Sequence, residues 1–150
     1  VAFPAAAVQQ GSPAPAFSLA DLKGNTVALQ HFRGQVVFLS FWAPWCTACS
    51  EELPELDRLY AKYGKDGFSV IGIVVDASAK RLAAFLQKAP VAFPVVVDVN
   101  GDVAESYRFS GLPAGYLIGR DGTIVRTYRG FDKQYISRYE REIAELLRNQ

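Results

Sequence analysis

The fold of this chain is decided by the stretch Trp42-Ala43-Pro44-Trp45-Cys46-Thr47-Ala48-Cys49, which holds both of its cysteines. Because only two residues separate the cysteines, both sulfurs can meet within a single helical turn and cycle between dithiol and disulfide. The motif follows directly on an apolar, strand-like run at residues 36–42, and the residues after it, 51–56, look helical. A C-x-x-C at a junction from strand to helix is typical of a redox site.

The size and charge of the chain restrict its class. A length of 150 residues indicates one domain, and a composition that is 50% hydrophobic and 13% aromatic is enough to build a core. The 16 basic and 15 acidic residues leave a net charge of +1. This balance gives no electrostatic argument for binding nucleic acid or an anionic membrane surface. No apolar run in the sequence approaches the length of a membrane span.

The first residues of the chain favour export. Residues 1–7 are small and apolar, and Ala5-Ala6-Ala7 fits the small-x-small pattern that precedes a signal-peptidase cut. We therefore expect a periplasmic or otherwise exported protein, in which residues 1–12 are a flexible tail left from a signal peptide and residues 13–150 are the domain. A membrane anchor ahead of residue 1 and an ordinary loose terminus are the alternatives.

The hydrophobic periodicity predicts strands that alternate with helices. Strands are expected at residues 16–19, 26–29, 36–42, 68–75, 93–97, 116–118 and 124–128, and helices at 46–63, after Ser78, at 103–107 and at 133–148. Pro54 should kink the first helix. A turn at 21–25 joins the first two strands as a hairpin, and Asp121-Gly122 joins the last two. This order predicts an α/β fold with a mixed sheet.

The two cysteines are expected to have different roles. Cys46 should lie at the helix N-terminus, where free N–H groups and the helix dipole favour a thiolate, so we assign it as the attacking nucleophile. Cys49, one turn further in, should be more buried and should resolve the mixed disulfide. A static disulfide or a pair of core thiols is the alternative. A structural zinc site needs four ligands, which the two cysteines and the lone His31 do not provide.

Two adjoining segments carry a family resemblance. Residues 41–49 are similar to the active-site stretch of the thioredoxin superfamily, and Ser50-Glu51-Glu52-Leu53-Pro54-Glu55-Leu56 resembles its TlpA/ResA-like group of exported thiol-disulfide oxidoreductases. The similarity extends over nearly all of residues 13–148. It implies a thioredoxin-like fold, with a central mixed sheet flanked by helices and an N-terminal β-hairpin. It also implies an inserted segment that precedes the second half of the domain, the half that begins at a cis-proline.

The resemblance also implies residues that contact the substrate. Gly111-Leu112-Pro113 aligns with the family's cis-proline, so Pro113 should pack against the C-x-x-C, and the backbone of Leu112 should pair with an extended substrate. An ordinary trans proline in a turn is the alternative. Trp45 is expected at the rim of the site as an apolar contact for partners, whereas Trp42 is expected in the core.

Glu52 is the third candidate for a part in catalysis. Thioredoxins proper carry a buried acid on the strand before the motif, where this chain has Ser40. The ResA-like group instead has a glutamate three residues after the second cysteine, and Glu52 matches it. The resemblance therefore implies that Glu52 exchanges a proton with Cys49, one helical turn away. The alternative is a solvated glutamate, favoured in the first turns of a helix by the dipole.

Two departures from the group leave the redox potential open. The group usually has hydroxylated residues after the cis-proline, where this chain has Ala114-Gly115. The dipeptide Thr47-Ala48 lacks the proline that is common in strong reductants. Because this dipeptide and Leu112 tune the acidity of the thiols, the sequence does not place the protein between reductant and oxidant.

The resemblance implies partners, but no metal or organic cofactor beyond the Cys46–Cys49 disulfide itself. We expect a monomer that acts on a protein substrate, such as an apocytochrome c with its own cysteine pair, and that is reset by a membrane-bound thiol donor. Two other classes share the fold. A thiol peroxidase of the peroxiredoxin type would have a threonine shortly before its reactive cysteine, and a copper carrier of the Sco type would have C-x-x-x-C with a distal histidine. Neither pattern is present.

Overall fold

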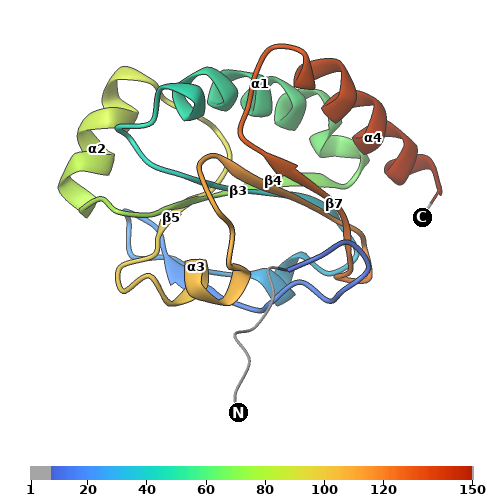
Figure 1. Ribbon diagram of the computed structural model, residues 1–150, viewed down its shortest axis with the longest axis horizontal. Helices are drawn as coiled ribbons and strands as arrows, with labels where there is room; N and C mark the ends of the chain where they lie inside the picture. The colour runs from blue at the N-terminus through green and yellow to red at the C-terminus, as the bar shows by residue number, and fades with distance from the viewer. Residues whose placement is uncertain (1–7, 150) are drawn as a thin grey trace.

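A five-stranded β-sheet forms the centre of the computed structural model, which describes residues 8–149 (Figure 1). The predicted signal-peptidase pattern, at residues 5–7, lies outside the described residues. The strands are β1 (Ser18–Ala20), β2 (Thr26–Ala28), β3 (Val36–Trp42), β4 (Phe68–Val74), β5 (Val95–Val97), β6 (Ala114–Ile118) and β7 (Ile124–Arg129). The helices are α1 (Thr47–Tyr63), α2 (Ala79–Lys88), α3 (Asp102–Tyr107) and α4 (Tyr135–Asn149), with two short 3-10 helices, η1 (Leu29–Phe32) and η2 (Gly64–Asp66).

The strands of the central sheet run in both directions. Their order is β5-β4-β3-β6-β7. β3 is parallel to β4, and β4 to β5, whereas β6 is antiparallel to both β3 and β7. β1 and β2 pair separately as an antiparallel hairpin. The predicted mixed sheet and N-terminal hairpin are therefore confirmed.

Helices and loops cover both faces of this sheet. α1, α2 and α4 lie on one face, and α3 and the β1–β2 hairpin lie on the other (Figure 1). β3 is central and buried on both sides, which is why it reads as one continuous apolar run. Side chains alternate along a strand, so Phe38 and Trp42 face α1 while Leu39 and Phe41 face α3. Ser40 is the only polar residue in β3, and it is fully buried.

The first long helix begins where the redox motif lies. Cys46 is the N-cap residue of α1, with extended backbone angles (φ −89°, ψ 113°), and the helix runs from Thr47 through Pro54 to Tyr63. Leu53, Leu56 and Leu59 are its buried apolar side chains. They recur at helical spacing and hold α1 against the sheet.

Some boundaries differ from the predicted ones for identifiable reasons. β5 begins at residue 95 rather than 93, because Pro94 has no N–H to give to a strand ladder.

Residues 8–12 belong to the predicted tail, yet the N–H of Gly11 donates to the carbonyl of Ile124 at 2.8 Å, and the N–H of Ile124 donates to the carbonyl of Ser12 at 2.9 Å. This part of the predicted tail is therefore bonded to the edge of the sheet.

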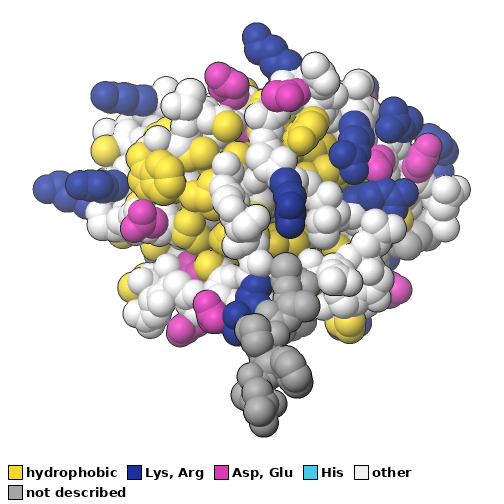
Figure 2. Space-filling view, in the orientation of Figure 1, with side chains coloured by type: hydrophobic (Ala, Val, Ile, Leu, Met, Phe, Trp, Pro, Cys, Tyr) yellow, Lys and Arg dark blue, Asp and Glu magenta, His cyan; other side chains and the backbone are white. Residues whose placement is uncertain are grey.

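The charged surface agrees with the nearly neutral composition. Basic and acidic side chains are interspersed on the face seen in Figure 2, and yellow apolar side chains reach the surface between them. Within residues 8–149, no helix combines the length and the apolar character that crossing a bilayer requires.

Candidate active site

The C-x-x-C lies beyond the carboxyl end of β3, at the start of α1. Cys46 and Cys49 form a disulfide, with their Cα atoms 5.2 Å apart. The backbone N–H of Cys49 donates to the sulfur of Cys46 at 3.3 Å. That donor and the positive end of the helix dipole would both stabilise a thiolate on Cys46 once the disulfide is reduced.

The two sulfurs differ in their access to solvent. Cys46 retains 8% of its surface, whereas Cys49 retains none and packs in the core with Leu53 and Leu56. A substrate disulfide can therefore approach Cys46 but not Cys49. The predicted difference in burial is present, and it favours Cys46 as the attacking sulfur.

Pro113 enters the same edge of the sheet from a distant part of the chain. The Leu112–Pro113 peptide bond is cis, as the resemblance implied, and Pro113 is buried. β6 begins one residue later, and Ala114 pairs with Phe41 near the end of β3. Leu112 is half-buried and packs against both cores, including the one that holds the cysteines. Pro113 and Leu112 therefore lie at the end of the sheet where β3 leads into the redox motif.

Glu52 is buried, with only 1% of its surface exposed. Its Oε1 accepts a hydrogen bond from the Ser40 hydroxyl at 2.8 Å, and its Oε2 accepts one from the Tyr139 hydroxyl at 2.7 Å. Burial raises the pKa of Glu52 to about 7, against the opposing effect of these two donors. The alternative of a solvated glutamate is therefore wrong. Glu51, its neighbour in sequence, is the exposed one.

The position of Glu52 suits an exchange of protons with the second cysteine. Cys49 and Glu52 are three residues apart on α1 and are both buried, so they share one face of the helix. A carboxyl group with a pKa near 7 is close to half-ionised at neutral pH. It can accept a proton from a thiol and return it without a large free-energy cost.

Sequence reasoning missed the two residues that hold Glu52. The family pattern marks Ser40 only as the place of a missing acid, although a lone hydroxyl in an apolar strand is itself a signal of a buried partner. Tyr139 was expected to face inward, but nothing in the sequence links its hydroxyl to a residue 87 positions earlier. Its ring packs against both Phe38 and Tyr128, with centroids 4.9 and 4.7 Å away.

The two tryptophans beside the motif differ as expected. Trp42 is fully buried and packs on Phe85, with ring centroids 5.2 Å apart. Trp45 is 61% exposed. It is one of the few large apolar side chains exposed among the described residues, and it directly precedes Cys46. Its indole therefore provides the apolar surface that a partner protein could cover.

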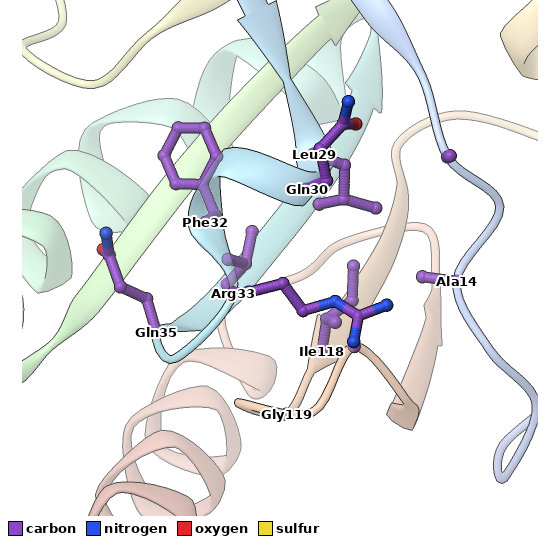
Figure 3. Close-up of a pocket in the computed structure, with 11 residues that line it drawn as sticks. Ala14, Leu29, Gln30, Phe32, Arg33, Gln35, Ile118 and Gly119 are labelled. Carbon is purple, nitrogen blue, oxygen red and sulfur yellow. The ribbon is translucent and has the colours of Figure 1, made fainter.

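Other features of the described residues offer no second redox or metal centre. No three His, Cys, Asp or Glu side chains in residues 8–149 are grouped so that they could hold a metal ion. A cavity of about 50 Å³ lies at the opposite end of β3 from the cysteines, between Leu29, Ile118 and Arg33 (Figure 3). It has room for a few water molecules and not for a peptide.

A disulfide beyond the end of a central strand, with a cis-proline just before the neighbouring strand, is typical of the thiol-disulfide oxidoreductases of the thioredoxin fold. The chain belongs to the AhpC/TSA family, whose model matches residues 10–127.

Curated relatives narrow the class further. The chain is 33% identical over 135 residues to thiol-disulfide oxidoreductase ResA of Bacillus thuringiensis subsp. konkukian, an alignment that covers 89% of this chain and 78% of the relative. It is 35% identical over 134 residues to ResA of Geobacillus kaustophilus, with 89% and 77% covered. The predicted ResA-like group is therefore confirmed, and the chain is a thiol-disulfide oxidoreductase.

Solved structures agree with this assignment. A Chlorobium tepidum protein described as a thiol:disulfide interchange protein DsbE superposes with a TM-score of 0.91 at 33% identity, over 94% of this chain and 99% of that one. The thioredoxin domain of a thiol-disulfide oxidoreductase from Bacteroides vulgatus superposes with a TM-score of 0.81 at 31% identity, over 91% and 99%. The predicted thioredoxin-like fold is confirmed.

Proposed function

We propose that the enzyme exchanges its disulfide with cysteine pairs of protein substrates, with Cys46 as the attacking sulfur. In the reducing direction, the Cys46 thiolate attacks one sulfur of a substrate disulfide, and the other substrate sulfur leaves as a thiolate. The Cys49 thiolate then attacks the Cys46 sulfur. This step forms the Cys46–Cys49 disulfide and releases the second substrate sulfur, so that two electrons pass to the substrate. The reverse sequence oxidises a substrate dithiol.

Glu52 supplies the proton relay for the second step. Cys49 is buried, and burial disfavours its ionisation, so its thiol needs a base before it can attack. Glu52 lies one helical turn away and takes that proton. Ser40 and Tyr139 donate to the two carboxylate oxygens and so hold the carboxylate in its place.

The setting we propose is cytochrome c maturation or thiol reduction in a periplasm-like compartment. The support is the relationship to proteins named ResA and DsbE, together with the resemblance to an exported group. The substrate is then an apocytochrome c, and a membrane-bound thiol donor returns the enzyme to its dithiol form. The enzyme works as a monomer and needs no metal or organic cofactor.

The observation that carries the role of each sulfur is the difference in burial between Cys46 and Cys49. A peptide containing C-x-x-C-H in its disulfide form is a suitable probe, because this sequence is that of a c-type haem attachment site. We expect the reduced Cys49→Ala variant to accumulate a covalent mixed disulfide with this peptide, visible by mass spectrometry. The Cys46→Ala variant should form none. Adducts on Cys46→Ala alone would reverse the two roles.

A further inference from the structure

A second and larger cavity, of about 690 Å³, opens beside the cis-proline loop. Its walls include the N-terminal residues 8–10, the loop that leads from α3 to Pro113, with Phe109 and Leu112, and the end of β7, with Thr127 and Arg129. Tyr116 of β6 also lines it. Because Leu112 is expected to pair with the substrate backbone, the cavity lies next to the path of the bound chain.

Tyr116 brings an unused hydrogen-bond donor to this cavity. Only 4% of its surface is exposed, and its hydroxyl makes no hydrogen bond to any residue in the described range 8–149. Burial raises the pKa of Tyr116 to about 12, opposed by the nearby guanidinium of Arg129. The hydroxyl is therefore protonated at neutral pH and can donate to a ligand.

The charge of the cavity has a single sign. Arg108 and Arg129 are its charged lining residues, and no Asp or Glu lines it. Arg108 already pairs with the exposed Glu105 at 3.0 Å, whereas Arg129 has no acidic partner within residues 8–149. A free guanidinium beside a free phenolic hydroxyl is a donor set that matches a carboxylate.

We propose that this cavity binds the carboxylate side chain of an acidic residue that lies within a few residues of the reacting cysteine in the substrate polypeptide. The proposal rests on the proposed exchange with protein substrates and adds a preference of sequence to it. Arg129 and Tyr116 bind the carboxylate, and Phe109 and Leu112 contact the apolar part of the same segment. β7 is the last strand of the sheet, and the chain's own residues 11 and 12 bond only to its first residue, Ile124. An extended peptide can therefore lie along the outer edge of β7 at its other end, near Arg129.

The experiment compares two disulfide peptides that differ only in having Glu or Gln next to the cysteine. At low salt and a low concentration of peptide, we expect the reduced enzyme to react about tenfold faster with the Glu peptide than with the Gln peptide. A hydrogen bond to a charged group changes a binding constant by about that factor. Arg129→Gln and Tyr116→Phe should each bring the ratio toward one. Arg81→Gln removes a charge from α2, on the opposite face of the sheet, and should leave the ratio unchanged. Equal rates for the two peptides with the unmodified enzyme would overturn the proposal.

A binding measurement separates this proposal from the exchange activity. The same peptides with serine in place of cysteine are titrated into the ¹⁵N-labelled oxidised enzyme, and amide shifts near Tyr116 and Arg129 are followed. If the Glu peptide binds and the Gln peptide does not, the proposed carboxylate site is supported even where no disulfide is exchanged. Exchange that proceeds without any such shift refutes the cavity and leaves the exchange intact. Displacement of the peptide by free acetate at equal concentration would indicate a site for any small carboxylate and would overturn the assignment to a peptide.

Discussion

At the scale of single residues, the most informative side chain is Glu52, a carboxyl group buried one helical turn from the buried sulfur of Cys49. Its two hydrogen bonds come from Ser40 on β3 and Tyr139 on α4, so three separate elements determine where its oxygens lie. In thioredoxins proper, as the resemblance indicated, the acid stands on the strand. Here the strand contributes the hydroxyl and the helix contributes the acid.

Replacing Glu52 with Gln should slow the second chemical step. The amide keeps the size of the side chain but cannot take the proton of Cys49, and loss of a general base costs about 100-fold in rate. Stopped-flow measurement of the decay of a mixed disulfide on Cys46 tests this. Glu51→Gln, at an exposed position of the same turn, is the matched control and should decay like the unmodified enzyme. An unchanged rate in Glu52→Gln would remove Glu52 from the mechanism.

Tyr139→Phe tests whether the hydrogen bond to Glu52 tunes that proton transfer. The lost hydroxyl donates to the ionised form of Glu52, so its removal should raise the pKa of Glu52. The midpoint of the pH profile for mixed-disulfide resolution should move upward by about one pH unit, because a hydrogen bond to a charged group contributes about 1.5 kcal/mol. Tyr135→Phe, on the same helix but bonded to the carbonyl of Arg129, should leave the midpoint in place. A slower rate with an unshifted midpoint would assign Tyr139 a packing role only.

At the scale of elements, the sequence predicted best where a local rule decides the structure. β3 reads directly from seven apolar or small residues, and the hairpin of β6 and β7 from Asp121-Gly122, where Gly122 takes the left-handed conformation (φ 87°) that the turn needs. The start of α1 follows from the C-x-x-C. By contrast, the partners of Glu52 and the cavity beside Leu112 depend on contacts between segments that are far apart in the sequence. The local pattern of hydrophobic residues does not predict such contacts.

The second helix carries a prediction of this local kind. Ser78 is the N-cap of α2, and its hydroxyl accepts the backbone N–H of Arg81 at 3.2 Å. Ser78→Ala should lower the free energy of unfolding by about 1 kcal/mol, as the loss of an N-cap side chain usually does. Urea unfolding followed by circular dichroism measures the change. Ser106→Ala removes a hydroxyl that bonds inside α3 rather than at a cap, and it should cost less. Equal losses in both variants would mean that the cap adds nothing specific.

At the scale of the whole molecule, α1 and α4 are joined at two depths on the same face of the sheet. The buried contact is the one between Glu52 and Tyr139. Nearer the surface, Glu140 of α4 accepts hydrogen bonds from Lys62 and Tyr63 of α1, and these donors lower the pKa of Glu140 to about 2. The contributions of these two carboxyl groups to the stability of the fold therefore change with pH in opposite directions. Glu140 stabilises the fold when it is ionised, whereas ionised Glu52 is the less stable form in the buried site.

The stability of the oxidised protein should consequently contain a pH-dependent term from Glu52. The folded-state pKa of about 7 lies above the ordinary value of 4.5, so the folded state holds the proton more tightly. The contribution is complete below pH 4.5 and is lost as the pH rises through 7, an effect of about 3 kcal/mol. Glu52→Gln has no such group. Its free energy of unfolding, relative to that of the unmodified protein, should therefore rise by about that amount between pH 4.5 and 8.

Urea unfolding of the oxidised protein at several pH values measures this difference. The effects of Glu140 and other carboxyl groups are common to both proteins and cancel, and Glu51→Gln provides the control for loss of a charge at an exposed site. A difference that stays constant with pH would mean that Glu52 titrates in the folded protein as it does in water. The proton relay to Cys49 would then lose its physical basis, because a carboxyl group with an ordinary pKa is a poor base for a thiol.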